Sequence, residues 1–195
     1  EALRGLGHGS GARGGARFGL AGRGREYTSV ALGSVEETLG DMTSAYSAFP
    51  NQGVRMRPYS VMSIADRECN VLEENRPDPR EAIRADTAFV MTNLMRGVVQ
   101  RGTAAAASSL DWPLAGKTGT MDEYTDAWFI GFDPNITVGV WVGYDDKKPL
   151  GNGATGAAAA LPIWMDFMKA YIHTRGDRKN PLHLHPSSKL VSVKL

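Results

Sequence analysis

Three β-rich segments that follow one another closely set the strongest limit on the fold of this chain. They span residues 114–119, 127–132 and 136–142, and Asp133-Pro134-Asn135 separates the last two. Asp, Pro and Asn favour tight turns, so the last two segments are predicted to be consecutive strands joined by a short turn. We therefore expect an antiparallel sheet in this half of the chain.

Helical patterns lie on both sides of these strands. Ser34 and Glu37 have the spacing of a capping box, and a helix over residues 35–49 follows, with Gly53 as its stop. The spacing of apolar residues predicts a second helix over 87–101, with Gly102 as its C-cap. A Gly-rich loop at 151–156 precedes a third predicted helix over 158–171, in which Pro162 suits the first turn.

Between the first two helices, the β-rich residues 59–65, a turn at 66–70 and Val71-Leu72 predict a hairpin. Residues 76–79 and the Ala/Ser-rich residues 104–111 are predicted to be loops. The order of elements is helix, hairpin, helix, three strands and helix. This order predicts an α+β fold in which helices cover an antiparallel sheet.

Composition divides the chain of 195 residues into three parts. Residues 1–25 hold nine Gly and five Arg, so we expect residues 1–27 to be disordered or to derive from an out-of-frame segment. Residues 28–172 are expected to form one domain, and residues 173–195 a polar tail. The Gly/Arg-rich segment lacks repeated Arg-Gly-Gly units with aromatics, which argues against RNA binding.

The charge balance gives no reason to expect a nucleic acid or an anionic membrane as partner, because 22 Lys and Arg nearly balance 21 Asp and Glu. The longest apolar run, at residues 157–165, is shorter than the ~20 residues of a membrane span. We therefore expect any membrane anchor or export segment to lie outside this chain.

Lys117-Thr118-Gly119-Thr120 is the segment with the clearest chemical potential. On a strand, Lys117 and Gly119 point to one face and Thr118 and Thr120 to the other. If the strand lies at a sheet edge, Lys117 offers a cation, the two hydroxyls offer hydrogen bonds, and Gly119 permits close approach. These groups suit a peptide carboxylate that binds by strand addition.

The surrounding motifs resemble the transpeptidase domain of class A, or bifunctional, penicillin-binding proteins, and specifically its C-terminal portion. They cover about residues 28–170: 31–34 (ALGS), 45–49 (AYSAF), 51–53 (NQG), 95–103 ending in Gly102-Thr103, 115–120 (AGKTGT), 126–131 (DAWFIG), 138–143 (VGVWVG), Thr155-Gly156 and 160–164 (ALPIW). The resemblance implies the fold that penicillin-binding proteins share with serine β-lactamases.

The resemblance also implies a function. Such an enzyme opens the D-alanyl-D-alanine bond of a peptidoglycan stem peptide, holds an acyl-enzyme and passes the acyl group to an amine; β-lactams acylate the same serine. Lys117, Thr118 and Thr120 would bind the substrate carboxylate beside Gly119, and the Thr120 backbone N–H would supply half of the oxyanion hole. No metal or cofactor is implied, and the expected location is the extracytoplasmic side of the inner membrane.

The family's S-x-x-K and S-x-N elements have no counterpart here. No serine is followed by lysine three residues later or by asparagine two residues later. We therefore expect this chain to be an inactive fragment of a larger synthase whose N-terminal part is missing. Two alternatives stay open: a non-catalytic penicillin-binding-like module, and a related D,D-carboxypeptidase or β-lactamase.

Most other candidate residues are expected to have structural and not functional roles. His183 and His185 fit a polar tail better than a metal site, and Cys69 an inert thiol in a turn. Asp122, Glu123 and Asp126 follow the Lys117 strand in a hairpin loop and are not expected to be catalytic, whereas Tyr124 lies where it can reach substrate. Trp128, Trp141 and Trp164 are expected in the core, and missing neighbours should leave Phe89, Leu94 and Val98 exposed.

Overall fold

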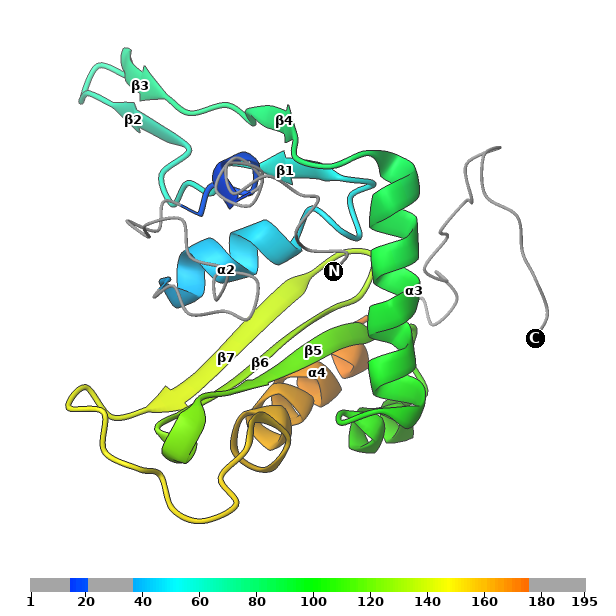
Figure 1. Ribbon diagram of the computed structural model, residues 1–195. Coiled ribbons are helices and arrows are strands. Elements are labelled where there is room, and N and C mark those ends of the chain that lie inside the picture. The colour runs from blue at the N-terminus through cyan, green and yellow to red at the C-terminus, as the bar shows by residue number, and fades with distance from the viewer. Residues whose placement is uncertain (1–14, 21–36, 176–195) are drawn as a thin grey trace.

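The computed structural model describes residues 15–20 and 37–175 (Figure 1). Its main sheet has three antiparallel strands in the order β5 (Ala115–Thr120), β6 (Asp126–Phe132) and β7 (Thr137–Gly143). This arrangement confirms the predicted strands. The register pairs Lys117 with Ile130, and Phe129 with Val140.

The turn between β6 and β7 is built on Asp133, which is fully buried. One carboxylate oxygen accepts hydrogen bonds from the backbone N–H groups of Asn135 (2.7 Å) and Ile136 (2.8 Å), and the other accepts one from Trp112 Nε1 (3.0 Å). Since a buried carboxylate needs such partners, the expected Asp-Pro-Asn turn also anchors Trp112.

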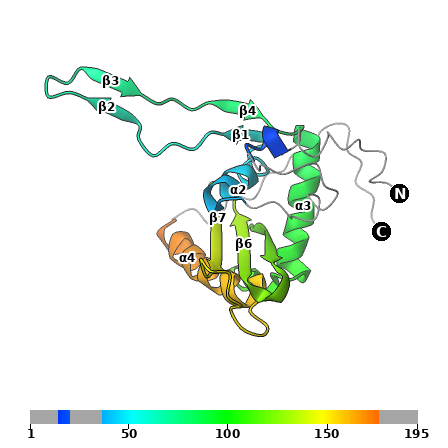
Figure 2. The same cartoon turned by 60° about the vertical axis from the view of Figure 1, so that its left-hand side comes forward.

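Helices cover both faces of the sheet (Figures 1 and 2). On one face, Trp164 of α4 (Leu161–Thr174) is fully buried and meets the Phe129 ring edge-to-face at 4.9 Å. On the other, Met95 of α3 (Ala85–Arg101) packs with Ala115 and Phe132, beside aromatic residues at and just after the end of α2 (Leu39–Tyr46). The α+β fold with helices over an antiparallel sheet is confirmed.

The first helix differs from its prediction. It begins at Leu39, and the cap is Thr38, whose hydroxyl accepts a hydrogen bond from the Asp41 backbone N–H at 3.0 Å. Ser34 lies outside the described residues. Helix α2 also ends at Tyr46 rather than at residue 49, because the chain continues as turns that reach the buried Gly53.

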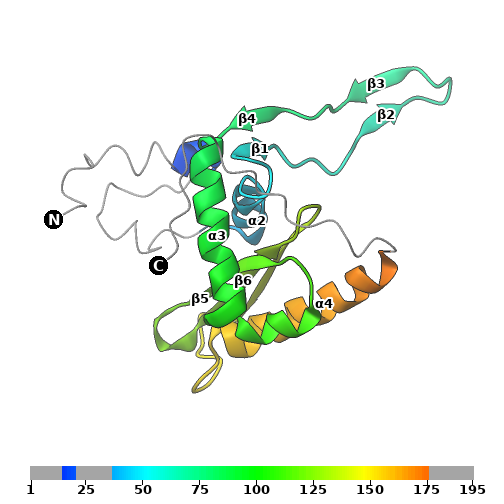
Figure 3. The same cartoon turned by 90° about the vertical axis from the view of Figure 1, so that its right-hand side faces the viewer.

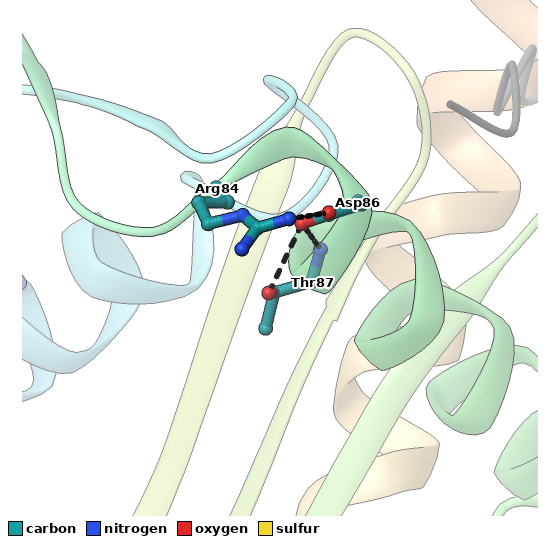
Figure 4. A network of polar contacts seen from close by, with 3 residues as sticks. All are labelled: Arg84, Asp86 and Thr87. Carbon is teal, nitrogen blue, oxygen red and sulfur yellow. Dashed lines mark hydrogen bonds and ion pairs between the residues drawn. The ribbon is translucent and has the colours of Figure 1, made fainter. Parts of the chain in front are cut away.

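Helix α3 begins in a short polar network (Figure 4). The Asp86 carboxylate is paired with the Arg84 guanidinium and accepts hydrogen bonds from the Thr87 N–H (2.7 Å) and Oγ1 (3.3 Å). The hydrogen bond from Arg84, more than any other contact, holds the pKa of Asp86 below its ordinary value. A carboxylate in the first turn also suits the helix dipole. The helix ends where predicted, and the Gly102 N–H bonds the Val98 carbonyl oxygen at 3.0 Å.

Two predicted loops form regular structure instead. Residues 105–110 make a 3₁₀ helix, η3 (Ala105–Leu110), and the loop expected at 76–79 runs into β4 (Pro79–Glu81). Strand β4 pairs with β1 (Val54–Met56), far away in sequence. At the other end of the sheet, a single π-helical turn, η5 (Gly156–Ala160), precedes α4, and Pro162 lies in the first turn of α4 as expected.

The predicted hairpin is present as β2 (Ser63–Ala65) and β3 (Val71–Glu74). It stands away from the sheet and its helices, and the β1–β4 pair joins it to them (Figures 2 and 3). All residues of β2 and β3 are exposed. We call residues 57–78 the arm.

Residues 15–20 are an exception to the disorder expected for residues 1–27. They form a helical turn in which the Phe18 ring lies 5.8 Å from that of Phe49. The remaining residues of that segment, and residues 176–195 with His183 and His185, lie outside the described part. No helix among the described residues is long and apolar enough to cross a bilayer.

Candidate functional site

Strand β5 presents one open edge. The Met121 N–H donates to the Asp126 carbonyl oxygen at 3.0 Å, which sets the phase of the antiparallel hydrogen bonds between β5 and β6. Because these bonds alternate along a strand, the N–H and C=O groups of Gly116, Thr118 and Thr120 point away from β6. No described strand pairs with that edge. The Thr120 N–H, the expected oxyanion donor, therefore faces the open edge.

Lys117 is exposed, and its ammonium lies over this edge. Its Nζ donates to the Thr118 carbonyl oxygen at 2.7 Å. No ion pair of Lys117 with a carboxylate is found among the described residues. An ammonium has three N–H donors, so two of them remain for an incoming anion.

The hydroxyls of Thr118 and Thr120 lie on the opposite face from Lys117, as predicted, and each has a partner in the protein. Thr118 Oγ1 is 2.8 Å from Thr103 Oγ1, just after α3, and Thr120 Oγ1 accepts the Gly156 N–H at 3.1 Å. Of the two threonines in the first pair, only one uses its hydrogen in the shared bond. One O–H there and that of Thr120 remain as donors.

Gly156 explains how η5 approaches β5 so closely, and Gly119 makes room for Trp128 of β6. A Cβ on Gly156 would lie 2.3 Å from the Trp128 carbonyl oxygen and 2.5 Å from that of Gly119. A Cβ on Gly119 would lie 3.1 Å from the Trp128 Cβ. Gly156 therefore lets η5 rest on the backbone of β5 and β6, beside Thr120. In this structure the bare Cα of Gly119 accommodates Trp128.

The loop after β5 is a tight turn with unusual backbone angles. Glu123 and Tyr124 have φ values of 59° and 56°, in the left-handed region that side chains rarely adopt. The Leu150 N–H donates to the Tyr124 carbonyl oxygen at 2.9 Å and so joins this turn to the loop that leads toward Gly156. Tyr124 is half-buried and lies in the loop that joins β5 to β6.

The carboxylate of Asp126 forms hydrogen bonds within the protein. Its carboxylate accepts hydrogen bonds from Trp141 Nε1 (2.7 Å) and Thr125 Oγ1 (3.0 Å). Trp141 and Trp128 are only half-buried, with ring centroids 6.3 Å apart, so the core position expected for all three tryptophans holds only for Trp164. Of the residues expected to be left exposed, Leu94 is 63% exposed, whereas Phe89 and Val98 are half-buried.

Thr103 and Gly156 also contribute to this site, although neither was predicted to be a site residue. Both occur in motifs that carry the family resemblance, as Gly102-Thr103 and Thr155-Gly156. Their contacts with Thr118 and Thr120 span 15 and 36 residues of sequence, so no local pattern indicates them. Cys69 is exposed at the tip of the arm, away from this site.

A lysine and two hydroxyls around an open strand edge, with helices behind the sheet, are the arrangement that the resemblance to penicillin-binding proteins implies. A model of the family described as the penicillin binding protein transpeptidase domain matches residues 5–169. Penicillin-binding protein 1A of Aquifex aeolicus is 44% identical over 169 residues, which cover 87% of this chain and 23% of that protein. The chain belongs to the class A penicillin-binding protein transpeptidase family.

Solved structures share the fold of this chain. The crystal structure of penicillin-binding protein 1A from Haemophilus influenzae superposes with a TM-score of 0.78 at 24% identity, over 92% of this chain and 33% of that one. A D,D-transpeptidase domain of a peptidoglycan glycosyltransferase from Eggerthella lenta gives 0.55 at 27% identity, over 71% and 34%. The chain spans about a quarter of the length of its Aquifex relative.

Proposed function

We propose that the open edge of β5 binds the C-terminal carboxylate of a D-alanyl-D-alanine stem peptide during D,D-transpeptidation in cell-wall synthesis. The observation that carries this proposal is the convergence of the Lys117 ammonium, two hydroxyl donors and the Thr120 N–H along one unpaired strand edge. A peptide that adds to this edge as a strand would bring its terminal carboxylate beside these donors.

Each group has a defined task in this proposal. Lys117 attracts the carboxylate, and the threonine hydroxyls orient it by hydrogen bonds. The Thr120 N–H then stabilises the oxyanion that forms when a serine attacks the penultimate carbonyl. β-Lactams, which also carry a carboxylate, would bind along the same edge.

The serine must come from another segment of polypeptide, since no S-x-x-K or S-x-N sequence occurs among these residues. That segment would lie along the open edge of β5, where it can bring a hydroxyl and a second N–H next to Thr120. We place the working enzyme at the cell envelope, where its stem-peptide substrate is found.

Binding of the carboxylate can be tested on the chain itself. We compare a diacetyl-lysyl-D-Ala-D-Ala peptide with its C-terminal amide by ligand-observed NMR, for the unchanged chain, Lys117→Met and Lys169→Met. A charge-assisted hydrogen bond contributes about 1.5–3 kcal/mol, so Lys117→Met should weaken acid binding by about 10- to 100-fold.

The control lysine, Lys169, is exposed on α4 and paired with Asp166, so its replacement should leave binding unchanged. The amide peptide should bind as weakly to the unchanged chain as the acid does to Lys117→Met. Equal binding of acid and amide, or equal losses for the two lysine variants, would refute the proposal.

The source of the nucleophile separates the proposal from its alternatives. Intact-mass spectrometry after incubation with penicillin should show unmodified chain, because no serine here has the activating lysine. A stoichiometric penicillin adduct would mean that the chain carries its own nucleophile. Addition of the segment that bears S-x-x-K and S-x-N should restore acylation; failure to do so would favour a non-catalytic binding module.

A further inference from the structure

The loop between β7 and η5 contains the only Asn-Gly sequence of the chain, Asn152-Gly153. Both residues are exposed, and in Figure 1 the loop is the yellow segment that runs from β7 beyond the end of the sheet. It forms a turn in which the Ala154 N–H donates to the Gly151 carbonyl oxygen at 3.2 Å. Gly153 has a φ of 81°, and a positive φ at this position is typical of a type II turn.

The side-chain amide of Asn152 forms no hydrogen bond with any other described residue. Other asparagines of the structure donate through their side-chain amides to oxygen atoms of the protein: Asn51, Asn70, Asn75 and Asn93. A carboxamide held in this way cannot turn toward the backbone of the next residue. The carboxamide of Asn152 can do so.

The backbone nitrogen that follows Asn152 is open as well. No described group accepts a hydrogen bond from the Gly153 N–H. Asn135 shows the opposite case, because the nitrogen that follows it belongs to Ile136 and donates to the Asp133 carboxylate at 2.8 Å. Asp133 is fully buried, so it holds the Ile136 nitrogen in place. Only at Asn152 are the carboxamide and the next nitrogen both without such a partner in the described part of the chain.

The two glycines beside Asn152 give these groups room to meet. The side-chain carbonyl carbon reaches the next nitrogen only if the peptide plane between Asn152 and Gly153 rotates. A Cβ at Gly151 or at Gly153 would meet no atom within 4 Å, so the loop has space for this rotation. Glycine also adopts either sign of φ readily, so the chain can follow the rotation on both sides.

We propose that Asn152 is a site of spontaneous deamidation through a cyclic imide. The Gly153 nitrogen gives its proton to water and attacks the side-chain carbonyl carbon of Asn152. A C–N bond forms, the bond to the amide nitrogen breaks, and ammonia leaves with a proton taken from water. A water molecule then opens the ring at either of its carbonyl carbons, which gives aspartate or isoaspartate. The net reaction consumes water, releases ammonia and involves no oxidation.

Either product changes the loop beside the candidate site. A carboxylate replaces a neutral amide and lowers the formal net charge of the chain, +1 at pH 7, to zero. Isoaspartate also adds a carbon atom to the main chain. Two hydrogen bonds fix the loop on either side of this position. One runs from the Leu150 N–H to the Tyr124 carbonyl oxygen (2.9 Å) and the other from the Gly156 N–H to Thr120 Oγ1 (3.1 Å).

Incubation of the full chain at mildly alkaline pH, followed by peptide mapping with mass spectrometry, tests the site. The peptide that contains Asn152 should exchange an NH group for an oxygen atom and separate into aspartate and isoaspartate forms, whereas the peptide that contains Asn135 should stay unchanged. A free peptide with the sequence of residues 147–156 (KKPLGNGATG) should react at a similar rate, because no described group restrains either reacting atom in the folded chain. If Asn152 stays intact in the folded chain while the free peptide reacts, the proposal is wrong.

Two variants separate ring closure from direct hydrolysis of the amide. Asn152→Gln keeps an exposed carboxamide but would have to close a larger ring, so the acidic product should be lost. Gly153→Ala keeps Asn152 and should slow the reaction, because a side chain restricts the positive φ that the turn uses. Aspartate without isoaspartate, or equal rates for the unchanged chain and Asn152→Gln, would refute the cyclic route.

Discussion

A substitution at Gly156 tests whether η5 packs directly against β5. A Cβ added at this position would lie 2.3 Å from the Trp128 carbonyl oxygen and 2.5 Å from that of Gly119. Both neighbours are backbone atoms of paired strands, so they cannot turn aside as a flexible side chain would. The substitution Gly156→Ala must therefore push η5 away from β5.

The size of the effect follows from the overlap. The closest separation must grow from 2.3 Å to the 3.4 Å at which ordinary contact begins. Overpacking of this kind costs about 1–3 kcal/mol, and loss of the hydrogen bond to Thr120 adds about 1 kcal/mol. We expect a loss of about 2–4 kcal/mol, or roughly 4–16 °C in Tm for a chain of this size.

The control is Gly97→Ala, the same substitution in the interior of α3. A Cβ at Gly97 meets no atom within 4 Å. Because alanine favours a helix over glycine, this variant should gain about 0.5–1 kcal/mol. Urea denaturation followed by tryptophan fluorescence measures both changes. If Gly156→Ala unfolds at the same urea concentration as the unchanged chain, η5 does not rest on β5 as described.

Three further substitutions test other parts of the structure. Trp164→Ala should destabilise by about 3–5 kcal/mol in urea denaturation, because it empties the fully buried centre of the core under α4. Thr103→Val should weaken binding of the D-Ala-D-Ala acid a few-fold, because it removes the hydroxyl that orients Thr118. The net contribution of such a hydrogen bond is about 1 kcal/mol. Asp86→Asn should lower the Tm at neutral pH, because the carboxylate pairs with Arg84 and accepts the Thr87 N–H in the first turn of α3.

The Asp86 effect has a defined pH dependence. Its folded-state pKa lies below the ordinary value of 3.8, so its stabilisation is fully present above that value and is lost as the pH falls through the lowered pKa. The Tm difference between Asp86→Asn and the unchanged chain should therefore narrow below about pH 4. A difference that stays constant with pH would contradict the role given to the charge.

Conservative variants serve as controls for the other two. Thr103→Ser keeps the hydroxyl and should bind like the unchanged chain, whereas a loss equal to that of Thr103→Val would indicate a packing effect alone. Trp164→Phe keeps most of the apolar volume and should cost clearly less than Trp164→Ala. Equal costs would argue against a tightly packed core at this position.

Local patterns in the sequence were enough to predict the sheet and the longest helix, whereas α4 begins and ends three residues later than predicted. The β-rich runs around Lys117 and Phe129, and the turn at Asp133, depend on neighbours in sequence, and helix α3 shows its apolar spacing over several turns. These elements match their predictions within a residue or two.

The missed elements depend on partners far away in sequence. Strand β4 begins at Pro79 and is exposed throughout, so its pairing with β1 leaves no alternation of apolar residues to detect. The predicted start of α2 relied on Ser34, whereas the helix begins after Thr38, whose hydroxyl bonds Asp41. Ser34 and Thr38 both have side chains that can cap a helix, and the sequence pattern alone does not show which of them does so.

The same limit applies to the candidate site. Alternation along a strand predicted that Lys117 and Thr120 lie on opposite faces. It did not show that Thr103 and Gly156 hold the two threonine hydroxyls, because those contacts depend on how α3 and η5 pack against β5.

The central claim is that the open edge of β5 binds a carboxylate. The backbone amide of Thr120 tests this claim most directly. In ¹⁵N–¹H spectra, titration with the D-Ala-D-Ala acid should shift the Thr118 and Thr120 amide signals, which face that edge. The C-terminal amide of the same peptide should shift them far less, and Lys117→Met should suppress the response to the acid. Shifts confined to other parts of the chain, or equal shifts with acid and amide, would contradict a carboxylate site on this strand.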